Sequence, residues 1–265
     1  MKYCLFVHEG RPAYGLIESV AGSDTITRLF RLENGQLPDE DAPTSKVAPI
    51  SFAEVELLAP ARPSKIICVG RNYLEHAKEF DNSVPTDVLI FSKPPSAIVG
   101  PRQPICRPTK LSQRVDHECE LAVIIGQRCR HITDDQDVRP FIHGYTCLND
   151  VTARDLQKKD GQWTRAKGFD TFCPIGPLVT DEIDPWEGVS VECRVNGELR
   201  QQGNTTQFIF PLDQVIRYVA AAMTLLPGDV IATGTPAGVS PLNAGDVVEV
   251  TCGGIGALSN PVADE

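Results

Sequence analysis

Residues 116–126 read Asp-His-Glu-Cys-Glu-Leu-Ala-Val-Ile-Ile-Gly, and they contain the most informative strand signal of the chain. The run from Leu121 to Ile125 is continuously apolar and ends at a glycine, which is typical of a short, buried β-strand. Glu118 and Glu120 lie two residues apart at the mouth of this run, so their carboxylates point to the same face. Burying an unpaired charge costs several kcal/mol, because water no longer solvates it. The strand therefore predicts a counter-charge: a shared proton, basic side chains or a divalent cation.

The composition is that of an ordinary globular protein with an acidic balance of charge. The 265 residues carry a formal net charge of −10, which argues against partners such as nucleic acid or an anionic membrane. A chain of this length forms one large domain, or a main domain with a smaller one attached. No stretch approaches the ~18–20 apolar residues of a membrane helix, and we find no targeting segment at the N-terminus.

The nine cysteines predict free thiols. Their number is odd, they are dispersed along the chain, and no C-x-x-C pair occurs, so neither a disulfide framework nor a structural zinc site is expected. His117 and Cys119 share the strand face opposite the two glutamates, but no second Cys/His pair with ligand spacing accompanies them. Because free thiols are typical of a reducing compartment, we expect a cytoplasmic protein.

Strand and turn signals dominate the chain and predict an α+β, β-rich fold. Residues 1–60 read as short strands with polar turns, and the proline-rich stretch 57–64 marks a boundary near residue 60. We therefore expect a small N-terminal β-rich domain, residues 1–60, and a catalytic domain, residues 61–265. In the C-terminal third, Asn196-Gly197 predicts a hairpin turn. The spacing of apolar residues over 212–223 predicts a helix with a buried stripe.

Polar caps predict three short helices. These are residues 73–79 after Asn72, a helix opened by Thr133 with Gln136, and a helix from Thr152 to about Lys159. The polar segment 33–49 contains several prolines and predicts a loop.

A third acid, Asp150, follows the predicted strand 145–148 and precedes a capped helix. Glu118, Glu120 and Asp150 together offer three oxygen ligands, and an all-oxygen set suits Mg2+ or Mn2+ better than zinc or copper. On spacing alone, a Glu-x-Glu pair is also typical of a solvated strand edge, and Asp150 of a helix-entry turn. The apolar run behind the glutamates favours the metal interpretation.

Three further segments carry side chains suited to catalysis. His76 and Glu79 share one face of the expected helix, where the carboxylate would orient the ring and raise its basicity. A surface pair without any function has the same spacing. Lys167 lies alone among small and apolar residues, which fits either a site residue or an exposed loop lysine. The loop 233–238, Thr-Gly-Thr-Pro-Ala-Gly, offers N–H groups and hydroxyls that can bind a carboxylate or simply close a turn.

These segments together resemble the fumarylacetoacetate hydrolase superfamily over about residues 60–262. The resemblance rests on five segments in the family's order: Gly70-Arg71-Asn72-Tyr73-x-x-His76-x-x-Glu79, His117-Glu118-Cys119-Glu120-Leu121-Ala122-Val123-Ile124-Ile125-Gly126, Asn149-Asp150-Val151-Thr152-Ala153-Arg154-Asp155, Lys167-Gly168-Phe169-Asp170 and Thr233-Gly234-Thr235-Pro236. One such segment is moderately specific, whereas five in the right order are strongly specific. The short first segment is similar to the branch of acylpyruvases, oxaloacetate decarboxylases and 2-hydroxyhepta-2,4-diene-1,7-dioate isomerases.

The resemblance implies a rolled β-sandwich that usually forms a homodimer. It implies that Mg2+ or Mn2+ binds to Glu118, Glu120 and Asp150. It also implies that His76 acts as a general base, oriented by Glu79, on a lid that becomes ordered when the substrate binds.

The expected substrate is a small 2-oxo or 2,4-dioxo acid, which can chelate a cation through its carboxylate and keto oxygens. The resemblance places Lys167, Gln157 and Thr235 against the substrate, and Lys167 would offset the excess negative charge of the site. Arg71 and Gly234 are the further substrate-binding candidates, Arg71 from the lid segment and Gly234 from the loop 233–238.

The main functional prediction is a metal-dependent hydrolase that cleaves the C–C bond of acylpyruvate-like 2,4-dioxo acids with water activated by His76. The alternative is an oxaloacetate decarboxylase or a 2-hydroxyhepta-2,4-diene-1,7-dioate isomerase, since the same cation stabilises the enolate of each reaction. A remote third hypothesis is a metabolite-binding protein without enzymatic activity. We expect the loop 80–87 and the face around Arg71, Trp163 and Arg165 to select the substrate.

Overall fold

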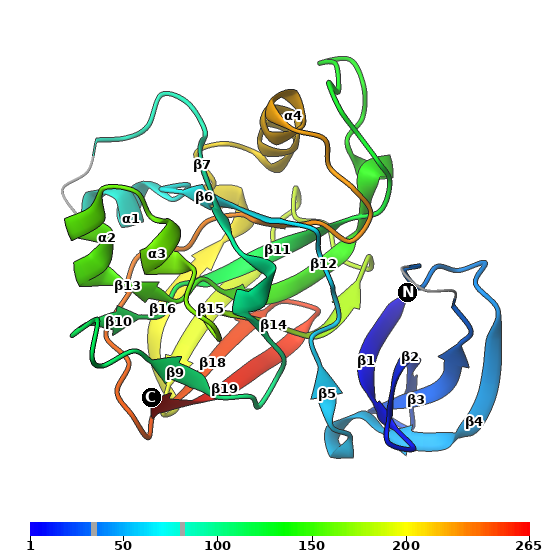
Figure 1. Ribbon diagram of the computed structural model, residues 1–265. Helices are drawn as coiled ribbons and strands as arrows, with labels where there is room; N and C mark the ends of the chain where they lie inside the picture. Colours follow the sequence, from blue (N-terminus) through cyan, green and yellow to red (C-terminus); the bar gives the residue numbers. More distant parts are fainter. Residues whose placement is uncertain (33–35, 80–82) are drawn as a thin grey trace.

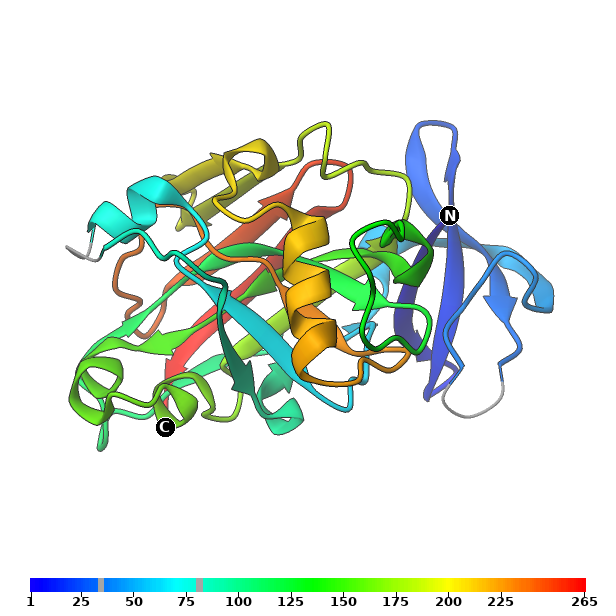
Figure 2. The same cartoon turned by 90° about the horizontal axis from the view of Figure 1, so that it is seen from above.

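The computed structural model describes residues 1–32, 36–79 and 83–265. In these ranges the chain consists mainly of strands, in two sheets that pack against each other, with short helices around them (Figures 1 and 2). The predicted β-rich α+β class is confirmed. No helix in these ranges is long and apolar enough to cross a membrane.

A large sheet and a smaller sheet contain almost all the strands. From edge to edge, the large sheet runs β4 (Thr44–Ser51), β3 (Ser23–Phe30), β2 (Arg11–Val20), β1 (Lys2–His8), β14 (Cys173–Thr180), β12 (Ile142–Asn149), β11 (Cys119–Ile125), β17 (Val230–Ala232), β6 (Ile66–Gly70) and β7 (Leu89–Lys93), with β5 (Leu57–Leu58) on β1 and β8 (Ile98–Val99) on β14. The smaller sheet runs β16 (Glu198–Asn204), β15 (Ser190–Val195), β18 (Val247–Cys252), β19 (Gly256–Asp264) and β9 (Ile105–Arg107). A separate pair joins β10 (Val115–Asp116) and β13 (Thr152–Ala153).

The helices of the described chain are short. The α-helices are α1 (Leu74–Glu79), α2 (Arg154–Asp160), α3 (Thr164–Lys167) and α4 (Leu212–Ala222). Single 3-10 turns are η1 (Phe52–Glu54), η2 (Pro95–Ala97), η3 (Arg139–Phe141) and η4 (Thr205–Gln207). Helices α1, α2 and α3 cluster at one end of the molecule in Figure 1.

The predicted buried strand is β11, and all of its residues are buried. It lies between β12 and β17 and is antiparallel to both, with Cys119 opposite Asn149. Because of this register, the residue before β11 and the residue after β12 lie side by side. The backbone N–H of Asp150 donates to the carbonyl of Glu118 at 2.8 Å. The antiparallel pairing thus joins the two parts of the predicted acidic triad.

Apolar side chains fill the space between the two sheets. Leu121 and Val123 of β11 belong to the same core cluster as Val191 of β15 and Val250 of β18. The helix predicted over 212–223 is confirmed as α4, and its apolar stripe packs into this cluster. The burial of this core fixes the position of β11, and therefore of the acids that it carries.

The N-terminal strands form a lobe beside the main body in Figure 1 and continue the large sheet. Strands β1 and β2 form a hairpin, and β1 also pairs with β14 through Lys2 opposite Thr180. The loop prediction for 33–49 is wrong in part, because Thr44–Ser51 forms β4 against β3. Residues 33–35 lie outside the described residues. The strand forms because β3 supplies hydrogen-bond partners for its backbone, which local composition does not reveal.

Two of the three helices predicted from polar caps form, but the side chains predicted to cap them make other hydrogen bonds. The Asn72 amide does not cap α1, because its Oδ1 accepts from the N–H of Phe210 and its Nδ2 donates to the carbonyl of Thr233, both at 2.8 Å. Thr152 bonds to the carbonyl of Asp150, and α2 begins without a side-chain cap. Gln136 Oε1 accepts from the backbone N–H and from the hydroxyl of Thr133, which is only half of a capping box, and these residues close a turn at which no α-helix begins.

Candidate active site

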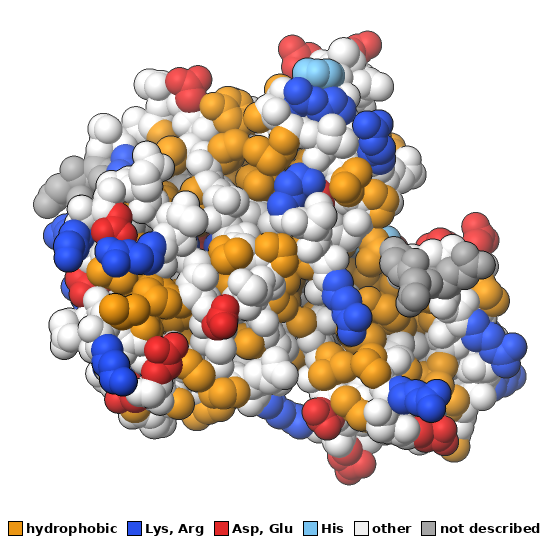
Figure 3. Space-filling model, viewed as in Figure 1, with side chains coloured by type: hydrophobic (Ala, Val, Ile, Leu, Met, Phe, Trp, Pro, Cys, Tyr) orange, Lys and Arg blue, Asp and Glu red, His pale blue; other side chains and the backbone are white. Residues whose placement is uncertain are grey.

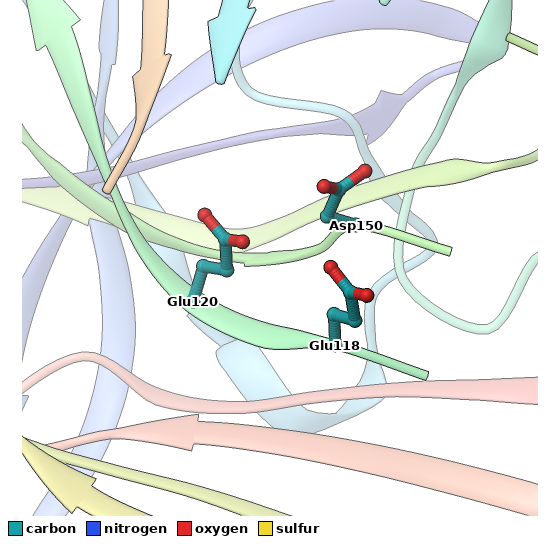
Figure 4. A group of neighbouring side chains, drawn as sticks. All are labelled: Glu118, Glu120 and Asp150. Carbon is teal, nitrogen blue, oxygen red and sulfur yellow. The ribbon is translucent and has the colours of Figure 1, made fainter. Parts of the chain in front are cut away.

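Three buried carboxylates meet where β11 begins and β12 ends. Glu118 precedes β11, Glu120 lies within it, and Asp150 follows β12; none is more than 4% exposed. One oxygen from each carboxylate lies within 4.8 Å of the other two, and Figure 4 shows the side chains converging from the two neighbouring strands. The structure thus brings together the three acids that we predict as metal ligands.

Basic side chains surround two of the three acids. Lys167 Nζ donates to Glu118 Oε2 at 2.7 Å and to Asp150 Oδ2 at 2.5 Å. Lys93 Nζ donates to Asp150 Oδ1 at 2.6 Å, and Arg154 donates to Glu118 Oε1. Burial opposes the ionisation of Glu118, but the charges of Lys167 and Arg154 outweigh it and hold the pKa of this carboxyl well below its usual range. Glu118 is therefore ionised before any cation binds.

Glu120 has a different electrostatic environment. Its burial raises the pKa, and the neighbouring charges of Asp150 and Glu118 raise it further. The backbone N–H of Gly234, 2.8 Å from Glu120 Oε2, opposes this rise only in part. A divalent cation among the three carboxylates would favour the ionised form of Glu120. The all-oxygen donor set and the unbalanced charge at Glu120 fit Mg2+ or Mn2+.

His76 and Glu79 lie together on α1, as predicted. His76 is 8% exposed, and its Nδ1 lies 3.3 Å from Glu79 Oε2. Glu79 also accepts from the backbone N–H of Gly238, with 3.1 Å between Oε1 and the nitrogen. The carboxylate therefore links α1 to the loop 233–238 and orients the imidazole ring. With Nδ1–H donating to Glu79, the neutral ring carries its lone pair on Nε2.

A pocket of about 380 Å3 opens over these groups. His76, Glu79, Lys167, Thr235 and the three acids all line it. The remaining wall includes the side chains of Phe91, Trp163, Arg71, Gln157, Lys158 and Arg154. Phe91 and Trp163 pack edge to face with 5.1 Å between ring centroids, and Lys167 Nζ lies 5.0 Å from the Phe91 centroid. One wall of the pocket is thus aromatic, and the rest is polar.

The substrate-binding candidates from the sequence have different positions. Arg71, with a left-handed φ of 57°, Gln157 and Thr235 all line the pocket. Gln157 Oε1 accepts from Arg154 Nη1 at 2.6 Å. Gly234 is not among the residues that line the pocket, and its N–H donates to Glu120. Its contribution is therefore to hold a carboxylate of the triad, and direct contact with a substrate stays a prediction.

Sequence reasoning missed Lys93, Arg154 and Gln201. Lys93 is 1% exposed and ends β7, two residues after Phe91, which shares its face. The alternation of side chains along this strand is the sequence signal that places Lys93 on the same face as Phe91. Arg154 belongs to the segment 149–155, whose pattern alone indicates no role for it; its guanidinium bonds to Asp116, Glu118 and Gln157. Arg165, expected near the substrate, instead forms an ion pair with Asp160. Residues 80–82 of the expected selectivity loop lie outside the described residues.

On a β-rich fold, three buried carboxylates that could hold a metal ion lie beside a histidine and a lysine. The chain belongs to the fumarylacetoacetate hydrolase family, because the model of the fumarylacetoacetate (FAA) hydrolase C-terminal domain matches residues 65–263. A second model, Rv2993c-like, N-terminal, matches residues 1–60. The resemblance stated from the five motifs is confirmed.

Known relatives and solved structures agree with this assignment. Protein Rv2993c of Mycobacterium tuberculosis is 48% identical over 213 residues, which cover 80% of each chain. Human mitochondrial oxaloacetate tautomerase FAHD2A is 45% identical over 253 residues, 91% of this chain and 77% of that one. The 5-carboxymethyl-2-hydroxymuconate delta-isomerase of Mycobacterium smegmatis has a TM-score of 0.88 at 40% identity, with full coverage of both chains. The 2-hydroxyhepta-2,4-diene-1,7-dioate isomerase of Mycobacterium marinum has a TM-score of 0.85 at 41% identity and covers 100% of this chain and 99% of that one.

These similarities favour one of the functional alternatives. Three of these four are named as a tautomerase or as isomerases, which fits the isomerase or decarboxylase alternative better than the main prediction of an acylpyruvate hydrolase. The chain is similar to family enzymes, and its buried acidic triad can hold a divalent cation.

Proposed function

We propose that this protein is a divalent-metal-dependent enzyme that interconverts tautomers or double-bond isomers of small 2-oxo dicarboxylic acids, of which oxaloacetate is the simplest that can enolise. The proposal is supported by the acidic triad, by the His76–Glu79 pair and by relatives named as oxaloacetate tautomerases and isomerases. Glu118, Glu120 and Asp150 would hold the cation, Mg2+ or Mn2+. When bound, the cation would polarise the 2-oxo group and make the adjacent carbon acidic.

The net charge of the pocket favours a dicarboxylic acid as the substrate. Among the described lining residues, four carboxylates face four cationic side chains. The carboxylates are Glu79, Glu118, Glu120 and Asp150, and the cationic side chains are Arg71, Arg154, Lys158 and Lys167. A divalent cation would therefore leave an excess of two positive charges, which a dianionic substrate neutralises. A monoanionic substrate would leave a net charge in a partly desolvated site, which is unfavourable.

His76 is the group best placed to move the proton. With Nδ1 paired to Glu79, the ring would accept the proton on Nε2, and Glu79 would stabilise the imidazolium that forms. Returning that proton to a different atom of the enolised substrate completes a tautomerisation. Lys167, next to Glu118 and Asp150, contributes positive charge on the substrate side of the triad. No water has to be activated in this reaction.

The decisive experiment follows the enol form of oxaloacetate by its ultraviolet absorbance. With Mg2+ or Mn2+, the purified protein should accelerate the approach to the keto–enol equilibrium, and EDTA should remove this activity. Coupled detection of pyruvate in the same reactions measures decarboxylation. A panel of acylpyruvates assayed in parallel tests hydrolysis. If the enol decays at the uncatalysed rate while acylpyruvates are cleaved, the proposal is wrong and the hydrolase interpretation stands.

The homodimer implied by family resemblance remains a proposal. Sedimentation equilibrium of the purified chain would test it, with a mass near twice that of one chain as the expected result.

A further inference from the structure

Gln201 lies on β16, in the smaller sheet, and its amide reaches the loop that carries Thr235. The residue is 1% exposed. Its Oε1 lies 2.8 Å from His117 Nδ1 and 3.0 Å from the backbone nitrogen of Cys119. Its Nε2 lies 2.7 Å from Thr235 Oγ1 and 2.6 Å from the carbonyl oxygen of Pro236. All four contacts are within hydrogen-bond distance, so the amide has a partner at each position.

Two backbone partners fix the orientation of the Gln201 amide. The Cys119 N–H can only donate, so it must face the amide oxygen. The Pro236 carbonyl can only accept, so it must face the amide nitrogen. Rotating the amide by 180° would place like groups together at both ends and would leave buried groups unpaired, at a substantial cost in free energy.

This orientation determines the direction of the neighbouring hydrogen bonds. His117 Nδ1 must donate to Gln201, and its Nε2 lies 2.8 Å from the hydroxyl of Ser240, which completes the support of the ring. On the other side, the second Gln201 Nε2–H donates to Thr235, so Thr235 Oγ1 is an acceptor in this contact. The proton of the Thr235 hydroxyl is therefore directed away from Gln201.

The backbone around Thr235 is held from the opposite side by β11. Thr233 Oγ1 donates to the carbonyl of Leu121 at 2.8 Å, and the Gly234 N–H donates to Glu120. Gly234 has a φ of 100°, and a Cβ there would lie 2.7 Å from Asn72 Cβ, so this close approach requires glycine. Thr235 lines the pocket at this rigid position, and the bond from Gln201 occupies one of the two lone pairs of its hydroxyl, so the O–H is directed to another partner.

We propose that Gln201 is a positioning residue that makes the Thr235 hydroxyl a hydrogen-bond donor to an anionic oxygen of the bound 2-oxo acid. The inference deepens the proposed function and rests on it for the identity of the substrate. The thiol of Cys119 also lies within reach of Thr235, but thiol sulfur is a weak acceptor, so a carboxylate or enolate oxygen displaces it. Gln201 thus favours ligands that accept a hydrogen bond at this point.

The experiment measures binding of oxalate, a dianion that chelates cations as a 2-oxo acid does, by calorimetry in the presence of saturating Mg2+. Thr235→Val, which preserves the shape of the side chain, should weaken oxalate binding roughly ten- to hundredfold, as expected for a lost bond to a charged group. Thr235→Ser, which keeps the hydroxyl, should restore it. Gln201→Met should weaken oxalate binding in the same direction. The double variant should be no weaker than the weaker single variant, because the two residues act through one bond.

Controls separate this role from a general effect on folding. Gln202→Met makes the same replacement at the next, exposed residue of β16 and should leave oxalate affinity unchanged. Thermal unfolding and Mg2+ affinity are measured for each variant; if Gln201→Met does not fold, the two Thr235 variants carry the test. Unchanged oxalate affinity in Thr235→Val, or additive losses in the double variant, would overturn the inference. Oxalate binding by the wild type without turnover of oxaloacetate would instead reject the proposed function and leave the donor role of Thr235 to be judged from the same titrations.

Discussion

Lys93 Nζ lies 2.6 Å from Asp150 Oδ1, and both side chains are almost completely buried. The lysine reaches this carboxylate from β7, at the edge of the large sheet, and also donates to the carbonyl of Val151 at 3.1 Å. Asp150 is thus held between Lys93 on one oxygen and Lys167 on the other. The arrangement holds one predicted metal ligand in place between two cationic side chains.

Replacing Lys93 should destabilise the metal-free protein. Lys93→Met leaves Asp150 with one fewer buried cation, and breaking a buried ion pair costs about 3–5 kcal/mol of unfolding free energy. The loss should be smaller with saturating Mg2+, because the cation then balances the carboxylate. Urea unfolding with and without Mg2+ measures both values. Lys158→Met, at an exposed lysine of the same pocket, is the matched control and should change stability little.

Replacing Glu120 should separate metal binding from stability. Glu120→Gln keeps the shape of the side chain and removes a charge that burial and two neighbouring carboxylates disfavour. We expect the metal-free variant to unfold at the same temperature as the wild type or higher. The rise in melting temperature on adding Mg2+ should disappear, since a ligand stabilises only the protein that binds it. A variant that is still stabilised by Mg2+ as strongly as the wild type would contradict the assignment of Glu120 as a ligand.

The His76–Glu79 pair should affect proton transfer more than ligand binding. His76→Ala should slow oxaloacetate tautomerisation by roughly a hundred- to ten-thousandfold, the usual contribution of a general base. Glu79→Gln should have a smaller effect in the same direction, because the ring keeps a partner. Affinity for oxalate with Mg2+ should change little in either variant. Decarboxylation, if present, should survive in His76→Ala, because it needs no proton abstraction by this residue.

His143 should make the attachment of the N-terminal lobe sensitive to acid. Its Nε2 lies 3.1 Å from the hydroxyl of Tyr3 on β1, and burial lowers its pKa despite the opposing charges of Asp181 and Asp39. The unfolded chain therefore binds this proton more tightly than the folded one. The free energy of unfolding should therefore be highest above about pH 6.5, the usual pKa of histidine, and should fall as the pH drops below this value.

Urea unfolding at pH values on either side of this transition checks the prediction for His143. His143→Phe should flatten the pH dependence of the unfolding free energy. His8→Phe, on β1 of the N-terminal lobe, should leave this dependence as in the wild type. An unchanged slope in His143→Phe would show that another group is responsible.

Local sequence signals were sufficient for the strand that carries the glutamates, for the acidic triad and for the family, but not for every strand, since β4 was predicted as a loop. The alternation of side chains along a strand places Glu118 and Glu120 on one face, and this needs no knowledge of distant residues. The turn at Asn196-Gly197 forms as predicted, because both residues adopt the positive φ that this dipeptide favours. Polar capping residues were less reliable signals for helices. The Asn72 side chain bonds to the distant residues Phe210 and Thr233, and Thr133 with Gln136 closes a turn at which no α-helix begins.

The amino-acid sequence by itself determined which carboxylates can share a cation, because their spacing and the motifs around them are properties of short segments. Only the tertiary structure decided what surrounds those carboxylates. Lys93 lies 57 positions from Asp150, and Gln201 lies 82 positions from Cys119, yet the two sheets place each pair in hydrogen-bond contact. A buried charge or amide takes its partner from whichever strand packs beside it, and that choice depends on sheet order and register rather than on neighbours in the chain.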